Sequence, residues 1–272
     1  MDRRALKHAA RQDVTSASYS PRRVTLVFLL LILALAALEV AANFLAQSRS
    51  SGGGYLSEAV SAGGRTYLML LIFSLLCQCL ATILTAGYTA FALKLNEQAV
   101  FSLRILWEGF YRAAPVLLLY LMKSMLLALW TSILSVPLLY LLSALLLSGA
   151  FSEADMYWIL LGGMSLLMFL LSYRYRMAVF MLMDDPGLSA RQAINQAKAV
   201  NKIHRFRLFV LDVSFLPWII LCIATCGILF IWKLPYMVAT YGRAYRFMLE
   251  DYARRQANFQ DFLSRMGQRP RE

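Results

Sequence analysis

The stretch VTLVFLLLILALAALEVAANFLA, residues 24–46, decides the fold class of this 272-residue chain. Its length matches the roughly 20 apolar residues that a helix needs to cross a bilayer. Apolar runs of similar length recur, and the chain is 60% hydrophobic and 15% charged, whereas a soluble domain is about 25% charged. The runs are continuous rather than alternating, which argues against a β-barrel. Because backbone groups must pair within hydrocarbon, we predict an all-α, polytopic membrane protein.

The apolar runs predict six transmembrane helices, over residues 24–46, 67–94, 113–147, 157–183, 208–226 and 229–250. The third run is too long for one upright helix, so we expect Pro137 to kink it or allow it to tilt. The Gly/Ser-rich segment 47–66 predicts a flexible loop, and 148–157 a short acidic one. The first run is longer than a signal-peptide core and lacks a clean cleavage site, which favours a retained anchor.

Two further segments predict amphipathic helices lying on the membrane surface. In LNEQAVFSLRILWEGFYR, residues 95–112, apolar residues recur at helical spacing after the possible cap Asn96. In the segment 186–207, Ser189 and Gln192 form a capping box. The apolar stripe that follows consists of Ala190, Ala193, Ile194, Ala197 and Val200. We therefore predict interfacial helices over 96–110 and 189–203.

The distribution of Lys and Arg predicts the orientation. These residues concentrate in 1–23, 94–112, 186–207 and 243–272, whereas the three outer loops hold only Arg49 and Arg65. The positive-inside rule then places both termini and both amphipathic helices in the cytoplasm. The predicted organisation is a basic cytoplasmic tail (1–23), a six-span transmembrane domain (24–250) and a charged cytoplasmic tail (251–272). The net charge of +12 is explained by these flanking residues, and we expect no nucleic-acid partner because no recognition module is visible.

The last third of the chain carries a series of recognisable elements. Tyr173 and Tyr175 form a Tyr-x-Tyr element, and an Asp-x-Pro step follows at 184–186. Beyond an Ala-rich amphipathic helix, the remaining elements are Leu211, Asp212, Ser214, Phe215 and Trp218, then Gly227, then Pro235 with Tyr236. With these elements the chain resembles the bacterial integral membrane family called domain of unknown function 975, over about residues 67–250. The resemblance implies a protein of the bacterial cytoplasmic membrane and lends no activity. The chain departs from the family pattern between Trp130 and Tyr173, where a long apolar insertion follows Pro137-Leu138.

Six charged residues fall in or near the predicted spans and are the candidate site residues: Asp212, Arg174, Arg176, Lys123, Glu39 and Lys233. Charges at such depth are functional-site hypotheses unless they pair or reach water. At about 1.5 Å per residue, Asp212 and the two arginines lie on the same side of the membrane. We predict that Asp212 clamps span five to Arg174 or Arg176. The alternatives are an aspartate that couples solute or proton movement, or one that marks where span five enters the membrane.

Other features have simpler interpretations. Glu39 and Lys233 both lie toward the outer side and could pair, although Lys233 could equally extend to the interface. Four tyrosines near the inner face are interpreted as an aromatic belt rather than a ligand cage: Tyr173, Tyr175, Tyr241 and Tyr245. The spacing of Cys222 and Cys226 could suit a metal, but no histidine falls in an apolar span to complete a site, so we interpret the cysteines as small buried residues.

The sequence contains no phosphate-binding loop, no zinc-protease motif and no nucleophile elbow. We therefore expect no catalytic residue, no cofactor and no metal, and hence no enzyme. Two function classes remain open. One is a non-enzymatic membrane scaffold or assembly partner, whose partners would be the lipid bilayer and a second membrane protein or another copy of the chain. The other is a permease for an unidentified small solute or ion, using the intramembrane charges.

Overall fold

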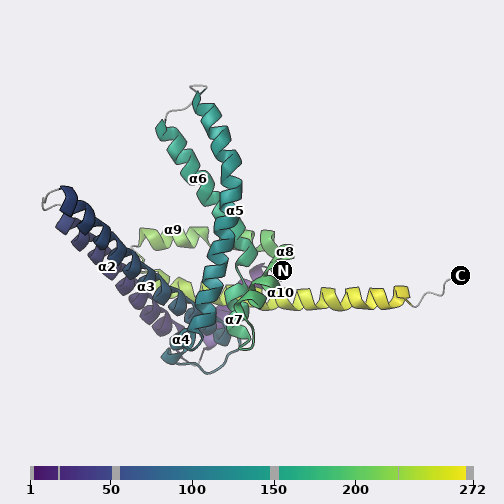
Figure 1. Cartoon of the computed structure of the whole chain (residues 1–272). Helices are drawn as coiled ribbons and strands as arrows, with labels where there is room; N and C mark the ends of the chain where they lie inside the picture. The colour runs from purple at the N-terminus through teal and green to yellow at the C-terminus, as the bar shows by residue number, and fades with distance from the viewer. Residues whose placement is uncertain (1–2, 18, 51–55, 148–152, 226, 268–272) are drawn as a thin grey trace. The chain divides into compact units, whose positions relative to one another are not determined.

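The structure is a computed structural model that describes residues 3–17, 19–50, 56–147, 153–225 and 227–267. Every regular element in these ranges is helical (Figure 1). In chain order the elements are α1 (Arg3–Ser16), α2 (Pro21–Ser50), α3 (Leu56–Asn96), the 3-10 helix η1 (Leu103–Trp107), α4 (Glu108–Tyr111), α5 (Ala113–Leu147), α6 (Glu153–Ser172), the 3-10 helix η2 (Tyr173–Tyr175), α7 (Ala178–Asp184), α8 (Ala190–Val213), α9 (Leu216–Ala224) and α10 (Phe230–Gly267). The all-α prediction is thereby confirmed for the part of the chain that is described.

Five stretches within these helices are long and apolar enough to cross a membrane. They are Pro21–Ala46, Tyr67–Asn96, Ala113–Pro137, Leu161–Asp184 and Ala190–Ala224. Their large apolar side chains are widely exposed, as at Val40 (69%), Leu75 (60%) and Leu166 (59%). A soluble monomer rarely exposes apolar surface on this scale, whereas hydrocarbon accommodates it. The chain is therefore a multi-pass membrane protein; the sixth predicted span, 229–250, falls in α10 and stays a prediction.

The described residues form two compact units. Unit 1 consists of Met1–Leu6, Leu118–Pro217 and Arg243–Glu272, and unit 2 of Lys7–Leu117 and Trp218–Gly242.

In unit 2, α2 lies along α3 (Figure 1). Thr25 Oγ1 and the Tyr88 hydroxyl share a hydrogen bond of 2.9 Å, and Phe28 stacks on the Tyr88 ring at 4.3 Å. Within the predicted basic tail, residues 3–16 form helix α1, in which Ala10 and Asp13 are buried.

Two glycines hold η1 and α4 against α3 in unit 2. A Cβ atom at Gly87 would overlap the carbonyl oxygen of Leu106, and one at Gly109 would overlap the carbonyl oxygen of Ile83. The absence of a side chain at both positions lets the two backbones approach this closely. Ile105 and Leu106 are buried in the contact. The segment between α3 and α5 is therefore fixed to α3 by backbone packing.

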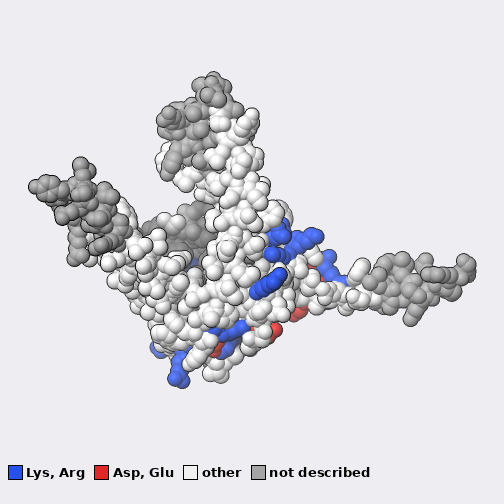
Figure 2. Space-filling model, viewed as in Figure 1, with Lys and Arg blue, Asp and Glu red and all other residues white. Residues whose placement is uncertain are grey.

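In unit 1, α8 packs against η2 and α7. The capping box of Ser189 and Gln192 is present at the start of α8, as the sequence predicts. The five residues of the predicted apolar stripe are all buried, and they bring α8 close to its neighbours because three of them are alanines. On the face seen in Figure 2, Lys and Arg side chains gather over α8, whereas the described part of α6 shows none.

Several predicted boundaries are wrong. The loop over 47–66 is helical up to Ser50 and again from Leu56, and only 51–55 lie outside the described residues. The continuous helix over 96–110 is absent: Asn96 ends α3 rather than capping a helix, and residues 97–102 are not helical. A left-handed backbone at Gln98 (φ 54°) turns the chain there. Helical spacing alone missed this turn, because it does not show that Ile105 and Leu106 are buried where η1 packs on α3.

Spans four and five are each interrupted. The predicted helix 157–183 changes to a 3-10 turn at Tyr173–Tyr175 before α7 begins. The predicted surface helix continues without a break to Val213, so that Asp212 lies in the last turn of α8 rather than at the start of a new span. A turn at Ser214 and Phe215 then separates α8 from α9. By contrast, α5 runs through Pro137 as one helix, and the predicted kink or tilt at Pro137 stays a prediction.

Adding a methyl group at Gly87 is expected to destabilise unit 2. In Gly87→Ala the new Cβ overlaps the Leu106 carbonyl, so α3 and η1 must separate, and overpacking of this kind typically costs about 1–3 kcal/mol. Thermal unfolding of the purified chain in detergent measures the effect. Gly162→Ala is the matched control, since a Cβ there meets no atom within 4 Å and alanine is the better helix former. Equal loss of stability in both variants would contradict the close approach.

Candidate functional site

Asp212 joins the end of α8 to the chain just after η2. Arg176 Nη1 donates to Asp212 Oδ2 at 2.6 Å, and the Tyr173 hydroxyl donates to the same oxygen. The side chains of Arg176 and Asp212 are 29% and 14% exposed, so the ion pair is largely shielded from solvent. The predicted contact between Asp212 and an arginine of span four is confirmed, and the arginine is Arg176 rather than Arg174.

Asn201 of α8 forms hydrogen bonds to the turn that precedes Arg176. Its Nδ2 donates to the carbonyl oxygens of Tyr173 (3.1 Å) and Arg174 (3.3 Å). A change from α to 3-10 geometry frees carbonyl groups at this position, and a buried carbonyl without a donor is costly. Asn201 is fully buried. The break between α6 and α7 is therefore stabilised by a side chain of α8, and the break in turn places Arg176 opposite Asp212.

Arg174 points to aromatic rings instead of a carboxylate. Its guanidinium carbon lies 5.7 Å from the centre of the Trp130 ring and 6.0 Å from that of Tyr175. Lys198 Nζ lies 5.6 Å from the centre of the same Tyr175 ring. Contacts of this kind attract a cation to the ring but leave its charge uncompensated. The region therefore combines one aspartate with an excess of positive charge.

The other candidate residues have separate surroundings. Lys123 Nζ lies 5.7 Å from the centre of the Tyr120 ring in α5. Glu39 accepts a hydrogen bond from Ser74 Oγ at 2.6 Å, and Lys233 Nζ lies 3.6 Å from the centre of the Trp218 ring. Of the two alternatives left open for Lys233, the pair with Glu39 is therefore not formed among the described residues. Instead, the partner of Glu39 is the Ser74 hydroxyl, and the partner of Lys233 is the face of the Trp218 ring.

The aromatic-belt interpretation is also wrong for three of the four tyrosines. Tyr173, Tyr175 and Tyr245 are each no more than 2% exposed, whereas belt residues face the membrane interface. The Tyr245 hydroxyl donates to Asp184 Oδ2 at 2.9 Å, and Arg246 Nη2 donates to Asp184 Oδ1 at 3.0 Å. Tyr173 and Tyr245 therefore connect elements of unit 1 through their hydroxyl groups.

A further polar contact joins Asp251 and Arg255 of α10 to His204 of α8. Arg255 Nε donates to Asp251 Oδ2 at 2.8 Å, and His204 Nε2 lies 3.2 Å from the same oxygen. The hydrogen bond from Arg255 holds the pKa of Asp251 below its usual value. The contact connects the later part of α10 to α8 within unit 1.

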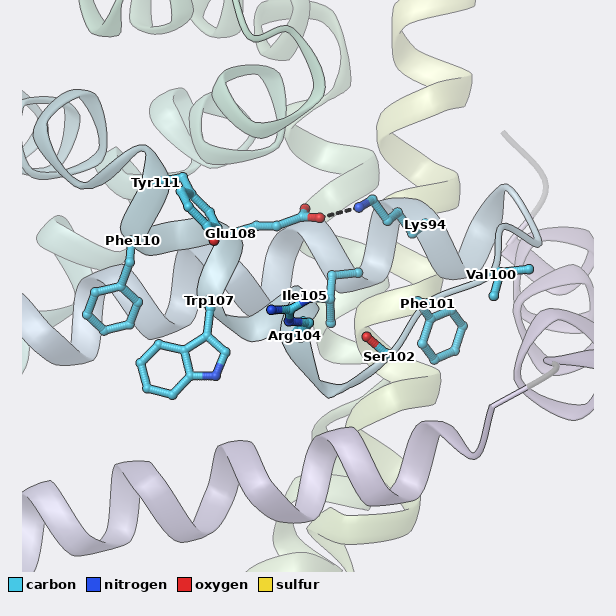
Figure 3. A pocket seen from close by; sticks show the side chains of 10 residues that line it. All are labelled: Lys94, Val100, Phe101, Ser102, Arg104, Ile105, Trp107, Glu108, Phe110 and Tyr111. Carbon is cyan, nitrogen blue, oxygen red and sulfur yellow. Dashed lines mark hydrogen bonds and ion pairs between the residues drawn. The ribbon is translucent and has the colours of Figure 1, made fainter.

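A groove in unit 2 is the second candidate site. It has a volume of about 610 Å³ and is lined by Lys94, Val100, Phe101, Ser102, Arg104, Ile105, Trp107, Glu108, Phe110 and Tyr111 (Figure 3). Lys94 and Glu108 form an ion pair across it. Trp107 and Tyr111 are 53% and 88% exposed. The predicted surface helix over 96–110 is thus replaced by a folded segment with an aromatic, partly charged hollow.

Sequence reasoning missed Lys198, Asn201 and Trp130 as members of the Asp212 region. Asn201 did carry a signal, because it falls on the apolar stripe of α8, where a polar residue requires a buried partner. Lys198 and Trp130 carried none, since their role depends on which helices touch. In the described residues no group of three or more His, Cys, Asp or Glu could hold a metal ion. Cys226 lies outside those residues, so the Cys222/Cys226 pair is not described.

Removing the Asp212 carboxylate is expected to destabilise unit 1. Asp212→Ala leaves Arg176 without its carboxylate and Tyr173 without its acceptor. Breaking a fully buried pair costs about 3–5 kcal/mol, and we expect less here because Arg176 is partly exposed. The double variant Asp212→Ala/Arg176→Met should recover much of the loss. Chemical unfolding in detergent measures all three proteins.

Glu250→Ala provides the control for this measurement. Glu250 pairs with Arg254 at 3.4 Å, and the two side chains are 64% and 76% exposed. Exposed pairs of this type are worth about 0–1 kcal/mol. If Asp212→Ala unfolds like Glu250→Ala, the clamp makes no substantial contribution to stability.

The sequence was compared with known protein families, curated proteins and solved structures. The sequence matches the family described as "Protein of unknown function (DUF975)" over residues 1–251. No curated protein and no solved structure matches it. The match covers most of the 272 residues and includes every element on which the resemblance was based. The chain therefore belongs to this family of proteins of unknown function.

Proposed function

We propose that the protein is a non-enzymatic scaffold or assembly partner in the bacterial cytoplasmic membrane. In this proposal it crosses the membrane six times, with both termini in the cytoplasm and α10 supplying the sixth span. The surface that would bind a partner is the groove of unit 2 that residues 94–111 line. The flanking basic residues Lys94, Arg104 and Arg112 favour a cytoplasmic location for it.

The groove is the observation that carries the proposal. Val100, Trp107 and Tyr111 expose 89%, 53% and 88% of their surface around it, and aromatic residues are the usual anchors of protein–protein interfaces. The segment is held in place by Gly87 and Gly109, so little conformational entropy would be lost on binding. A rigid hollow with exposed aromatic groups and an internal ion pair fits a segment of another membrane protein.

The intramembrane carboxylates support the same choice. Asp212 contacts Arg176 and Tyr173, and Glu39 accepts from Ser74. Carboxylates with such partners stabilise helix contacts more readily than they exchange a solute. A small-solute or ion permease is the alternative, and the observation that favours it is the excess of positive charge around Arg174.

A photo-crosslinking amino acid at Trp107 or Tyr111 tests the scaffold proposal. In native membranes we expect discrete protein adducts at both positions, because a partner segment would lie within reach of the groove. The same amino acid at Leu129, an exposed apolar position of α5 (56%), is the control and should give mainly lipid adducts. Glu108→Ala should weaken the groove adducts by removing the ion pair with Lys94.

Two results would contradict the scaffold. One is an adduct pattern at Trp107 and Tyr111 that matches Leu129. The other is solute or proton flux through proteoliposomes of the purified chain that is lost in Asp212→Asn while the variant unfolds like the parent. The second result would favour the permease directly.

The proposed orientation is tested with single cysteines and a membrane-impermeant thiol reagent. We expect cysteines at positions 98, 187 and 256 to react only after the cytoplasmic side is opened, because the basic segments lie there. Cysteines at positions 52 and 150 should react in intact cells. Labelling of position 256 from outside would exclude six spans and indicate an odd number of crossings.

A further inference from the structure

Several cations gather around η2 without matching carboxylates. Arg174 and Lys198 both lie within 6.0 Å of the centre of the Tyr175 ring. Lys123 lies about two turns before Trp130 on α5, and the Arg174 guanidinium lies 5.7 Å from the centre of the Trp130 ring. In the described part of the chain, Asp212 is the carboxylate of this region, and it forms an ion pair with Arg176. Lys123, Arg174 and Lys198 have no carboxylate within salt-bridge distance among those residues.

Two buried donors in the same place have no partner. Arg174 Nε and the Tyr175 hydroxyl are buried and make no hydrogen bond to the described residues. Tyr175 is 1% exposed, so its hydroxyl is shielded from bulk water. A buried donor without an acceptor is costly, and like charges in a medium of low dielectric constant repel strongly. Both costs disappear if an anion with several acceptor oxygens occupies the region.

We propose that Lys123, Arg174, Lys198 and the Tyr175 hydroxyl bind a phosphate-bearing anion, either a lipid headgroup or free phosphate. Phosphate offers more acceptor oxygens and more charge than a carboxylate, and a guanidinium is well shaped to bind it. Trp130 and Tyr175 hold the Arg174 side chain through their rings. The Asp212–Arg176 clamp fixes the turn from which Arg174 projects. This site lies in unit 1 and does not depend on the proposed groove in unit 2.

Anion-dependent thermal unfolding of the full chain in an uncharged detergent tests the site. One arm titrates inorganic phosphate, and the other adds phosphatidylglycerol, with phosphatidylcholine as the zwitterionic reference. A saturable rise in melting temperature with phosphatidylglycerol alone indicates a lipid headgroup, and a rise with inorganic phosphate indicates the free anion. Either result supports the proposal and identifies the source.

Substitutions then locate the effect. Arg174→Gln and Lys198→Gln should each weaken anion binding by roughly tenfold or more, because each removes a charge-assisted hydrogen bond. Tyr175→Phe keeps the ring and should weaken binding by a smaller factor. Lys202→Gln is the matched control, since Lys202 is exposed on the same helix. Without any added anion, Lys198→Gln should melt at or above the parent temperature because a repulsion is removed.

Three outcomes would overturn the site. The first is a parent protein whose melting temperature responds to neither anion. The second is an equal loss of affinity in Lys198→Gln and Lys202→Gln, which would indicate general attraction to a chain of net charge +12. The third is an anion-free loss of stability in Lys198→Gln with unchanged anion binding, which would assign Lys198 a structural role only.

Discussion

Inside hydrocarbon, a backbone carbonyl that loses its helical partner must find another donor. The Asn201 amide meets this requirement at the turn Tyr173–Tyr175, where the α-helical pattern is interrupted. The interruption determines the partners of the two arginines in this region of unit 1, because it turns Arg176 toward Asp212 and Arg174 toward aromatic rings. One buried side chain of α8 thus determines how the charges of the preceding segment are distributed.

In unit 2 a small number of residues likewise determines how a segment packs, but here they are glycines rather than a hydrogen-bonding side chain. Gly87 and Gly109 let backbone meet backbone, so the segment after α3 folds onto α3. This packing buries one aromatic residue of that segment and leaves two others exposed. Phe101 turns inward against Phe91, while Trp107 and Tyr111 remain exposed. The groove exists because the turn at Gln98 brings these residues back beside Lys94.

The two candidate sites also differ in which charges and hydrogen-bond donors remain uncompensated. At the groove, Lys94 and Glu108 neutralise each other, and the apolar and aromatic side chains of Val100, Trp107 and Tyr111 remain exposed. Around η2, the surplus is positive charge and buried donors. Apolar and aromatic surface attracts another protein segment or lipid, whereas unpaired cations attract an anion. A membrane scaffold with an anion-binding site is consistent with both, since the sites lie in separate units.

Composition and apolar run length were sufficient to predict an all-α, multi-pass membrane protein, because the bilayer imposes the same length and hydrogen-bonding limits on any chain. Local pattern also predicted the capping box at Ser189, the buried stripe of α8 and the nearness of Asp212 to an arginine. The turn at Tyr173–Tyr175, the glycine contacts and the choice of Arg176 over Arg174 could not be predicted in this way. They depend on which side chains of distant segments meet, and hydrophobic periodicity records only that a face is buried, not against what. Tertiary packing therefore decided where the charges are paired, where they are left in excess and where the chain opens into a groove.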